Sequence, residues 1–125
     1  MRVFIYGTLR SNEINNRIMQ EADGKFLYRC STADEYFKGY ICDGYGNEMY
    51  PYIMEVGTKG NSGSSVNYID GEMWEVPDKF ISILDKFEDG YIRKNITITF
   101  DGLKCDAEAY FISGEFYQEI SRKTK

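Results

Sequence analysis

The sequence contains no histidine among its 125 residues. This absence excludes the Ser and Cys hydrolases that depend on a histidine base, and it excludes any metal site with a histidine ligand. Chemistry must therefore come from carboxylates, tyrosines, lysines and thiols. The three cysteines are odd in number and widely separated, which suits neither a disulfide framework nor paired zinc ligands, so we expect reduced thiols.

Long apolar runs and basic clusters are also missing. No stretch approaches the roughly 20 apolar residues of a membrane-spanning helix, and the N-terminal residues predict a strand and a turn rather than the apolar part of a signal peptide. The formal net charge is −5, and no basic cluster is denser than the terminal Arg122-Lys123-Thr124-Lys125. We therefore expect a cytoplasmic protein with no nucleic-acid and no membrane partner.

Aromatic residues are plentiful: eleven Tyr and eight Phe stand against two Pro, in runs that favour strands. A chain of 125 residues has the usual size of one domain, and we expect a single domain over residues 1–125. Alternating runs predict about six or seven mostly antiparallel strands and two helices. The predicted fold class is therefore α+β, a small curved sheet or barrel with two flanking helices.

The first helix is expected soon after the N-terminal strand. Residues 2–6 have extended character and end at Gly7. Ser11 or Asn12 can cap a helix that runs to about Ala22, because short polar side chains accept hydrogen bonds from the first free N–H groups of a helix. The N-terminus thus predicts a strand, a tight loop and a helix.

Several other segments carry local signals. Residues 26–30 and 36–41 are expected to pair as a hairpin, and Pro51 indicates an edge strand. Residues 57–65 predict a mobile surface loop, either a solvated hairpin end or a lid. Residues 115–125 form a tail that is either frayed or helical.

Glu88 is singled out by helix geometry. Pro77 and Asp78 open a helix, and Glu88 follows Leu84 by one turn, at the edge of the apolar face. The negative end of the helix dipole and partial burial both raise the pKa of a carboxyl there. Such a carboxyl can move protons near neutral pH. Two alternatives stay open: Glu88 extends into solvent, or it pairs with Arg93.

The segment Tyr6-Gly7-Thr8-Leu9-Arg10 has the form of a strand that turns into a helix. The backbone N–H groups of such a turn can converge on a carboxylate or an oxyanion, and Gly7 lets a ligand approach closely. The spacing of phosphate-binding loops is missing. We expect the wall of a small-molecule pocket here, and an ordinary turn is the alternative.

Three segments occur together and in order: Tyr6-Gly7-Thr8-Leu9-Arg10, Gly71-Glu72-Met73-Trp74-Glu75-Val76 and Leu84-Asp85-Lys86-Phe87-Glu88. This set closely resembles the γ-glutamylcyclotransferase-like (AIG2-like) family over nearly the whole chain, nearest the γ-glutamylamine cyclotransferase branch. The resemblance implies a small barrel whose cavity holds a γ-glutamyl group. It also implies an amide-cyclising transferase or lyase without metal or cofactor, in which the substrate's α-amine attacks its own γ-carbonyl and releases 5-oxoproline and an amine.

The resemblance assigns roles to individual residues. Glu88 matches the catalytic general acid/base, and the implied substrate-binding residues are Tyr6, Gly7, Thr8, Leu9, Tyr52 and Tyr91. For Tyr52 and Tyr91, packing inside the protein is the alternative. The segment Asp89-Gly90-Tyr91 is shorter than in relatives, which leaves the leaving amine open. A pocket that binds a small anion without converting it is therefore the alternative function.

Overall fold

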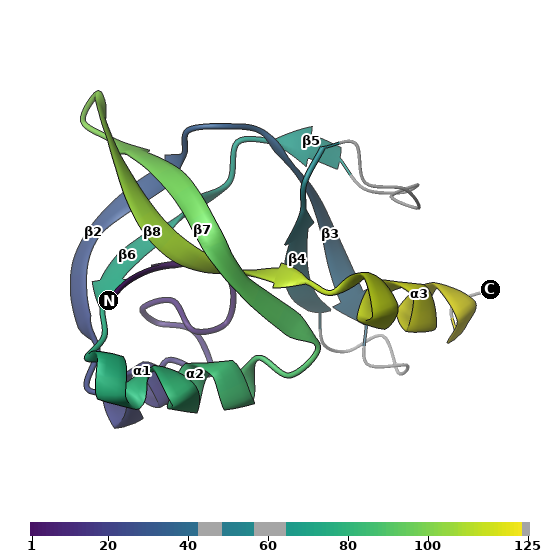
Figure 1. Cartoon of the computed structure of the whole chain (residues 1–125), viewed down its shortest axis with the longest axis horizontal. Helices are drawn as coiled ribbons and strands as arrows, with labels where there is room; N and C mark the ends of the chain where they lie inside the picture. The colour runs from purple at the N-terminus through teal and green to yellow at the C-terminus, as the bar shows by residue number, and fades with distance from the viewer. Residues whose placement is uncertain (43–48, 57–64, 124–125) are drawn as a thin grey trace.

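The computed structural model describes residues 1–42, 49–56 and 65–123 (Figure 1). Its elements are β1 (Arg2–Ile5), α1 (Arg17–Glu21), β2 (Lys25–Thr32), β3 (Tyr36–Cys42), β4 (Met49–Met54), β5 (Ser65–Asn67), β6 (Asp70–Glu75), the 3₁₀ helix η1 (Asp78–Phe80), α2 (Ile81–Phe87), β7 (Tyr91–Phe100), β8 (Leu103–Ile112) and α3 (Gly114–Lys123). The predicted α+β class is confirmed. This part of the chain holds one strand and one α-helix more than the upper end of the prediction.

Five strands close into a barrel in the order β1-β6-β2-β7-β8. Neighbouring strands are antiparallel except for β1 and β8, which run parallel and meet at Val3 and Glu108. A three-stranded sheet in the order β4-β3-β5 stands beside the barrel (Figure 1). Pro51 lies on β4, an edge strand, as predicted, because proline has no N–H to donate to a second neighbour.

The predicted hairpin of residues 26–30 with 36–41 is wrong. β2 pairs with β6 and β7, whereas β3 pairs with β4 and β5. Between β2 and β3, the buried Thr32 hydroxyl donates to the Asp34 carbonyl at 2.6 Å and accepts from the Ile69 N–H at 3.0 Å. These bonds tie the connection to the chain just before β6, and the two strands continue into different sheets.

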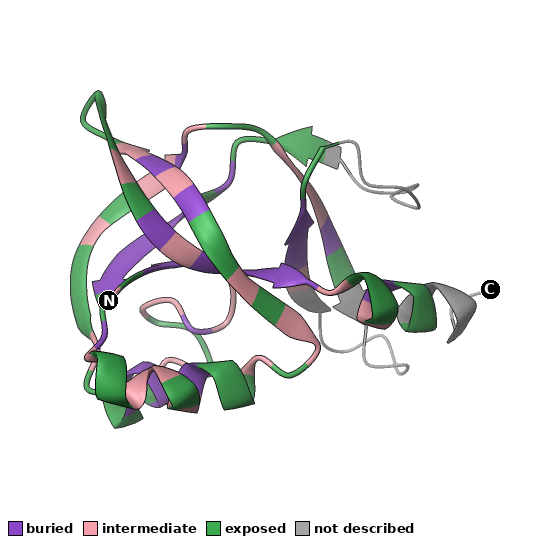
Figure 2. Cartoon of the chain, viewed as in Figure 1, coloured by how far each residue is buried: buried purple, intermediate pink, exposed green. Residues whose placement is uncertain are grey.

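Successive side chains of β1 pack into two different apolar clusters, because strand side chains point alternately to opposite faces. Val3 and Ile5 pack with Met19 of α1 and Leu84 of α2, whereas Phe4 packs in a second cluster with residues of β4, β6, β7 and β8. Figure 2 shows buried residues concentrated in the barrel strands and exposed residues on the outer faces of the helices. Both helices are thus held against the barrel.

The first helix begins at Arg17, later than the sequence predicts. The N–H and the hydroxyl of Ser11 both donate to Oε1 of Glu72, at 2.8 and 3.2 Å, and Asn12 has a positive φ of 66°. Ser11 is therefore held by β6 and does not cap a helix, and the residues before Arg17 form turns.

The C-terminal segment is helical, so the frayed alternative is wrong for Gly114–Lys123. The Ser113 hydroxyl caps α3 by accepting a hydrogen bond from the Phe116 N–H at 3.1 Å, and the Tyr117 side chain is buried. Residues 57–64 of the predicted loop lie outside the described residues. Across the described ranges, no helix is long and apolar enough to span a membrane.

Candidate active site

A cavity of about 460 Å³ lies between the barrel, the end of α2 and the edge of the small sheet. This volume falls within the roughly 300–1,000 Å³ that is typical of small-molecule sites. Its wall is formed by residues 4–8, Asn15, Pro51, Phe87, Glu88, Asp89, Tyr91, Tyr110 and Phe116. Most of these side chains are apolar or aromatic, so a charged group inside the cavity is poorly hydrated.

Glu88 caps the C-terminal end of α2 at the cavity. Its N–H donates to the Leu84 carbonyl at 2.9 Å, and its own carbonyl accepts from the Tyr91 N–H at 3.0 Å. Burial in the cavity wall raises the pKa of the Glu88 carboxyl to about 7. The carboxyl therefore exists in both protonation states near neutral pH, as a proton-transfer group requires.

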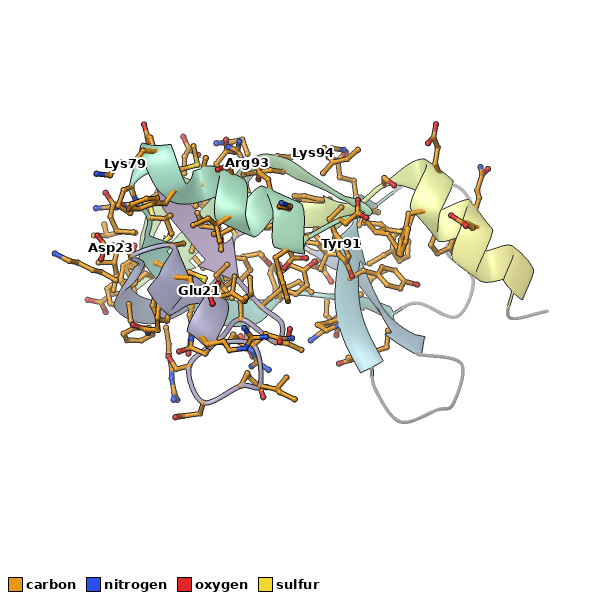
Figure 3. The ribbon with its side chains drawn as sticks, turned by 90° about the horizontal axis from the view of Figure 1, so that it is seen from below. Glu21, Asp23, Lys79, Tyr91, Arg93 and Lys94 are labelled. Carbon is orange, nitrogen blue, oxygen red and sulfur yellow. The ribbon has the colours of Figure 1, made fainter. Side chains whose placement is uncertain are left out.

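Arg93 pairs with other carboxylates and not with Glu88. Its guanidinium lies 2.9 Å from Asp85 and 3.4 Å from Glu108 (Figure 3 labels Arg93 beside α2). Burial favours the protonated form of Asp85, but hydrogen bonds from Arg93 and from the Tyr110 hydroxyl outweigh it and lower the Asp85 pKa. Among the described residues, Glu88 has no ion-pair partner, so no nearby cation offsets its burial.

Internal hydrogen bonds shape the loop after β1. The N–H and the Nε of Arg10 both donate to the Gly7 carbonyl, at 3.1 and 3.0 Å. The N–H of Asn15 donates to the Thr8 carbonyl at 3.0 Å, and its side-chain amide donates to Thr8 Oγ1 at 3.0 Å. Within the described ranges, the N–H groups of Gly7, Thr8 and Leu9 donate no hydrogen bond to another backbone group.

Two contacts join this loop and β7 to the small sheet. A Cβ atom at Gly7 would lie only 3.0 Å from Cγ of Pro51, so glycine allows this close approach. The Tyr91 hydroxyl donates to the Pro51 carbonyl at 3.1 Å, and Figure 3 shows Tyr91 beside the end of α2. Burial raises the pKa of Tyr91, so its hydroxyl remains protonated as the donor of this bond.

A buried carboxylate anchors the loop from the other side. Glu72 on β6 is 5% exposed, and its Oε1 accepts hydrogen bonds from Ser11 and from the Trp74 indole at 3.1 Å. Nearby, burial raises the pKa of the free Cys30 thiol to about 12, which makes it a poor nucleophile. In the described part of the chain, no three side chains gather that could hold a metal ion.

The structure brings most of the predicted site residues together. Tyr6, Gly7 and Thr8 lie on the cavity wall together with Glu88 and Tyr91. These residues come from the loop after β1 and from the junction between α2 and β7, which are far apart in the sequence. The Tyr6 hydroxyl also donates a hydrogen bond of 2.6 Å to a backbone carbonyl of β8, which fixes the ring in the wall.

Two predicted side chains lie elsewhere. Leu9 is 2% exposed and packs in the cluster between the barrel and the helices. Tyr52 is buried next to α3, and its ring centroid lies 5.9 Å from that of Tyr117. Neither side chain lines the cavity. Both side chains are large, and each directly follows a residue of the cavity wall in the sequence. For Tyr52, packing inside the protein was the alternative given above, and the structure places the side chain there.

Eight cavity residues were not predicted: Phe4, Ile5, Asn15, Pro51, Phe87, Asp89, Tyr110 and Phe116. Asn15 lies in a segment that was expected to be helical, and Phe116 lies in the tail. Tyr110 lies on β8, and its hydroxyl donates to Asp85 at 2.6 Å. Pro51 had a usable signal, since it directly precedes the predicted Tyr52.

The barrel thus carries a cavity that is lined both by the loop after β1 and by a carboxyl of raised pKa, Glu88. A family model described as gamma-glutamyl cyclotransferase, AIG2-like, matches residues 3–124. The chain belongs to this family, and the resemblance inferred from the sequence is confirmed.

Relatives agree with this assignment, and a solved structure shares the fold. A Bos taurus protein named gamma-glutamylaminecyclotransferase is 24% identical over 125 residues, which span 92% of this chain and 66% of that protein. A Methanocaldococcus jannaschii protein, provisionally named a gamma-glutamylcyclotransferase, is 30% identical over 113 residues, spanning 87% of this chain and 82% of that protein. The crystal structure of a uropathogenic E. coli-specific protein shares the fold, with a TM-score of 0.71, 18% identity, and coverage of 94% of this chain and 82% of that chain.

Proposed function

We propose that the protein is a γ-glutamyl cyclotransferase that converts a γ-glutamylamine, or a related small γ-glutamyl conjugate, to 5-oxoproline and a free amine. The observation that carries the proposal is the position of Glu88, whose carboxyl lines the cavity with a pKa of about 7. Family membership supports the reaction class. The name of the bovine relative supports a γ-glutamylamine as the substrate.

Glu88 serves as general base and then as general acid. Its carboxylate takes a proton from the α-ammonium group of the substrate, and the freed amine forms a bond to the γ-carbonyl carbon. When the bond to the leaving nitrogen breaks, that nitrogen takes the proton back from Glu88. The ring nitrogen, which still carries two hydrogens, gives its second proton to the departed amine, so the products are a neutral lactam and an ammonium ion. A pKa of about 7 suits both steps, because the group neither holds nor rejects the proton strongly near neutral pH.

The loop after β1 supplies the hydrogen-bond donors in this proposal. The N–H groups of Gly7, Thr8 and Leu9 donate to no other backbone group within the described residues and can bind the α-carboxylate or the oxyanion that forms on the γ-carbonyl. The attack closes a five-membered ring within one molecule. Holding one end of the substrate therefore places the amine within reach of the carbonyl.

Release of 5-oxoproline from a panel of γ-glutamyl compounds tests the proposal. Removal of the proton acceptor in Glu88→Gln should lower kcat by roughly 10²–10⁴-fold. Glu21→Gln is the matched control, because Glu21 is a largely exposed carboxylate on α1. Undiminished turnover by the Glu88→Gln variant would sink the assignment. Failure of the wild type on every compound, together with an intact metabolite retained on purification, would favour a binding protein instead.

A further inference from the structure

A second cavity, of about 550 Å³, lies between the loop after β1 and the strands β2 and β6. Arg10 and Ser11 of the loop line this second cavity, whereas residues 6–8 and Asn15 line the candidate active site. Among the described residues, the two cavities share no lining residue. One loop therefore contributes to the walls of two separate cavities.

Glu72 presents an open carboxylate oxygen to the second cavity. The residue is 5% exposed and lines the cavity. Its three hydrogen bonds, from the N–H and the hydroxyl of Ser11 and from the indole of Trp74, all reach Oε1. Oε2 accepts none within the described residues, where no fully enclosed side-chain oxygen lacks a partner, so Oε2 is open to the cavity. A donor placed there would replace the hydration that burial removes from Oε2.

Arg29 lies opposite Glu72 without pairing with it. The two residues are partners of β2 and β6, so their side chains leave the sheet on the same face. The described residues nevertheless form no ion pair between this guanidinium and this carboxylate. Both side chains line the second cavity. A ligand can therefore lie between them, with an anionic group on Arg29 and a cationic group on Glu72.

The remaining charges of the wall define the class of ligand. Arg10 already pairs with Glu13 at 2.9 Å, and Asp70 adds an exposed carboxylate two residues before Glu72 on the same face of β6. The cavity thus offers one guanidinium and two carboxylates. A ligand with anionic groups only would be repelled by the carboxylates, and an amine alone would leave Arg29 without a partner. A small molecule that carries one ammonium and one carboxylate satisfies both sides.

We propose that the second cavity is a binding site for a free α-amino acid, whose ammonium group donates to Glu72 and Asp70 and whose carboxylate accepts hydrogen bonds from Arg29. An ammonium group has three donors, which is enough for both carboxylates, and a guanidinium can bind a carboxylate through two parallel hydrogen bonds. The inference does not rest on the cyclotransferase reaction. It adds a ligand that the reaction does not consume.

Calorimetry with L-alanine, methylammonium chloride and sodium acetate tests the inference. L-Alanine carries both charged groups, whereas each of the other probes carries one, so L-alanine should bind at least about tenfold more tightly than either. Arg29→Ala should weaken L-alanine binding about tenfold, and Asp70→Asn about threefold, because each removes a charge-assisted hydrogen bond. Arg17→Ala and Glu21→Gln, on the exposed side of α1, are the matched controls and should leave binding unchanged.

Glu72→Gln tests the open oxygen itself. The variant keeps one oxygen to accept from Ser11 and Trp74 and replaces the other by an NH₂ group, which cannot accept from an ammonium group. L-Alanine binding should fall at least about tenfold. If the variant does not fold, as judged by thermal melting, Arg29→Ala and Asp70→Asn carry the comparison, since both residues are exposed.

The location of binding separates this inference from the proposed function. In amide NMR spectra, L-alanine should shift the signals of Ser11 and Gly71, which line the second cavity, and should do so equally in Glu88→Gln. Binding that is weakened by Glu88→Gln and unaffected by Arg29→Ala would place the amino acid in the candidate active site and overturn the inference. No binding of L-alanine, or equal binding of L-alanine and either single-charge probe, would also overturn it. None of these results depends on the release of 5-oxoproline.

Discussion

The hydroxyl of Tyr91 donates a hydrogen bond to the carbonyl of Pro51 at 3.1 Å, and this bond joins the barrel to the small sheet. Tyr91 begins β7, and its N–H also donates to the carbonyl of Glu88. One residue therefore connects the edge strand β4 to the turn that carries the proposed acid/base. Both parts line the cavity, through Pro51 and Glu88.

Tyr91→Phe removes the hydrogen bond to the Pro51 carbonyl but keeps the aromatic ring in the cavity wall. We therefore expect the free energy of unfolding of the variant to be lower than that of the wild type by about 1 kcal/mol. KM should rise more than kcat falls, because the proton-transfer group is untouched. Urea denaturation and 5-oxoproline kinetics measure the two effects. The exposed Tyr68→Phe should change neither, and equal effects of both variants would contradict this role.

The rate should depend on the protonation of Glu88. The carboxylate form is the base, and its pKa of about 7 means that the base is lost as the pH falls through 7. We expect kcat/KM to drop about tenfold for each pH unit well below 7. A pH–rate profile of the wild type, beside the residual activity of Glu88→Gln, measures this limb. A flat wild-type profile between pH 5 and 7 would argue against Glu88 as the base.

Glu88 should also cost stability at neutral and alkaline pH. In the unfolded chain its pKa is ordinary, about 4.3, whereas burial raises it to about 7 in the folded protein. Between these values the folded state binds more protons, so the contribution of Glu88 to stability is greatest below pH 4 and declines as the pH rises to about 7.

Glu88→Gln removes this pH dependence. We expect the variant to be more stable than the wild type by roughly 2 kcal/mol at pH 8, allowing for partial exposure of the carboxyl, and equally stable at pH 4. Denaturant titrations at both pH values provide the measurement. The same variant should lose activity, so stability and activity change in opposite directions. Equal stability at pH 8 would mean that the folded protein does not disfavour the carboxylate.

Gly90 and Gly102 form a matched pair. Both have a positive φ, but a Cβ at Gly90 meets the Phe116 ring at 2.7 Å, whereas a Cβ at Gly102 meets nothing within 4 Å. Gly102→Ala should cost about 1 kcal/mol through backbone strain alone. Gly90→Ala should cost roughly 2–4 kcal/mol, because it adds the clash to the strain.

Thermal melts compare the two glycine variants directly. Activity should fall only in Gly90→Ala, since Gly102 lies in the β7–β8 turn and not on the cavity. Equal losses of stability in Gly90→Ala and Gly102→Ala would show that the Phe116 ring moves aside at little energetic cost. That result would weaken the assignment of α3 to the cavity wall.

Local patterns were sufficient for many elements. Apolar spacing predicted the helical region that ends at Glu88. Glu88 itself was recognisable because its place in the last turn of an amphipathic helix is a local property. The rise of its pKa followed from the same position.

Pairing between distant segments could not be predicted in the same way. The alternation of β2 and β3 indicated strands but not their partners, and the predicted hairpin was wrong because each strand pairs in a different sheet. The local sequence predicted Ser11 as a helix cap. In the structure its N–H and its hydroxyl instead donate hydrogen bonds to Glu72, which is 61 residues away in the sequence. Phe116 and Tyr110 gave no signal of their own.

The sequence alone determined most of the strands, the family resemblance, the loop of Tyr6 to Arg10, and Glu88 as the candidate base. Hydrophobic periodicity and turn residues depend on positions only a few residues apart, so these features can be recognised in short sequence segments. Only the tertiary structure decided which side chains share the cavity, that Arg93 pairs with Asp85 and leaves Glu88 unpaired among the described residues, and that Phe116 joins the wall. Those contacts arise when segments far apart in the chain pack together, and no short sequence window contains both partners.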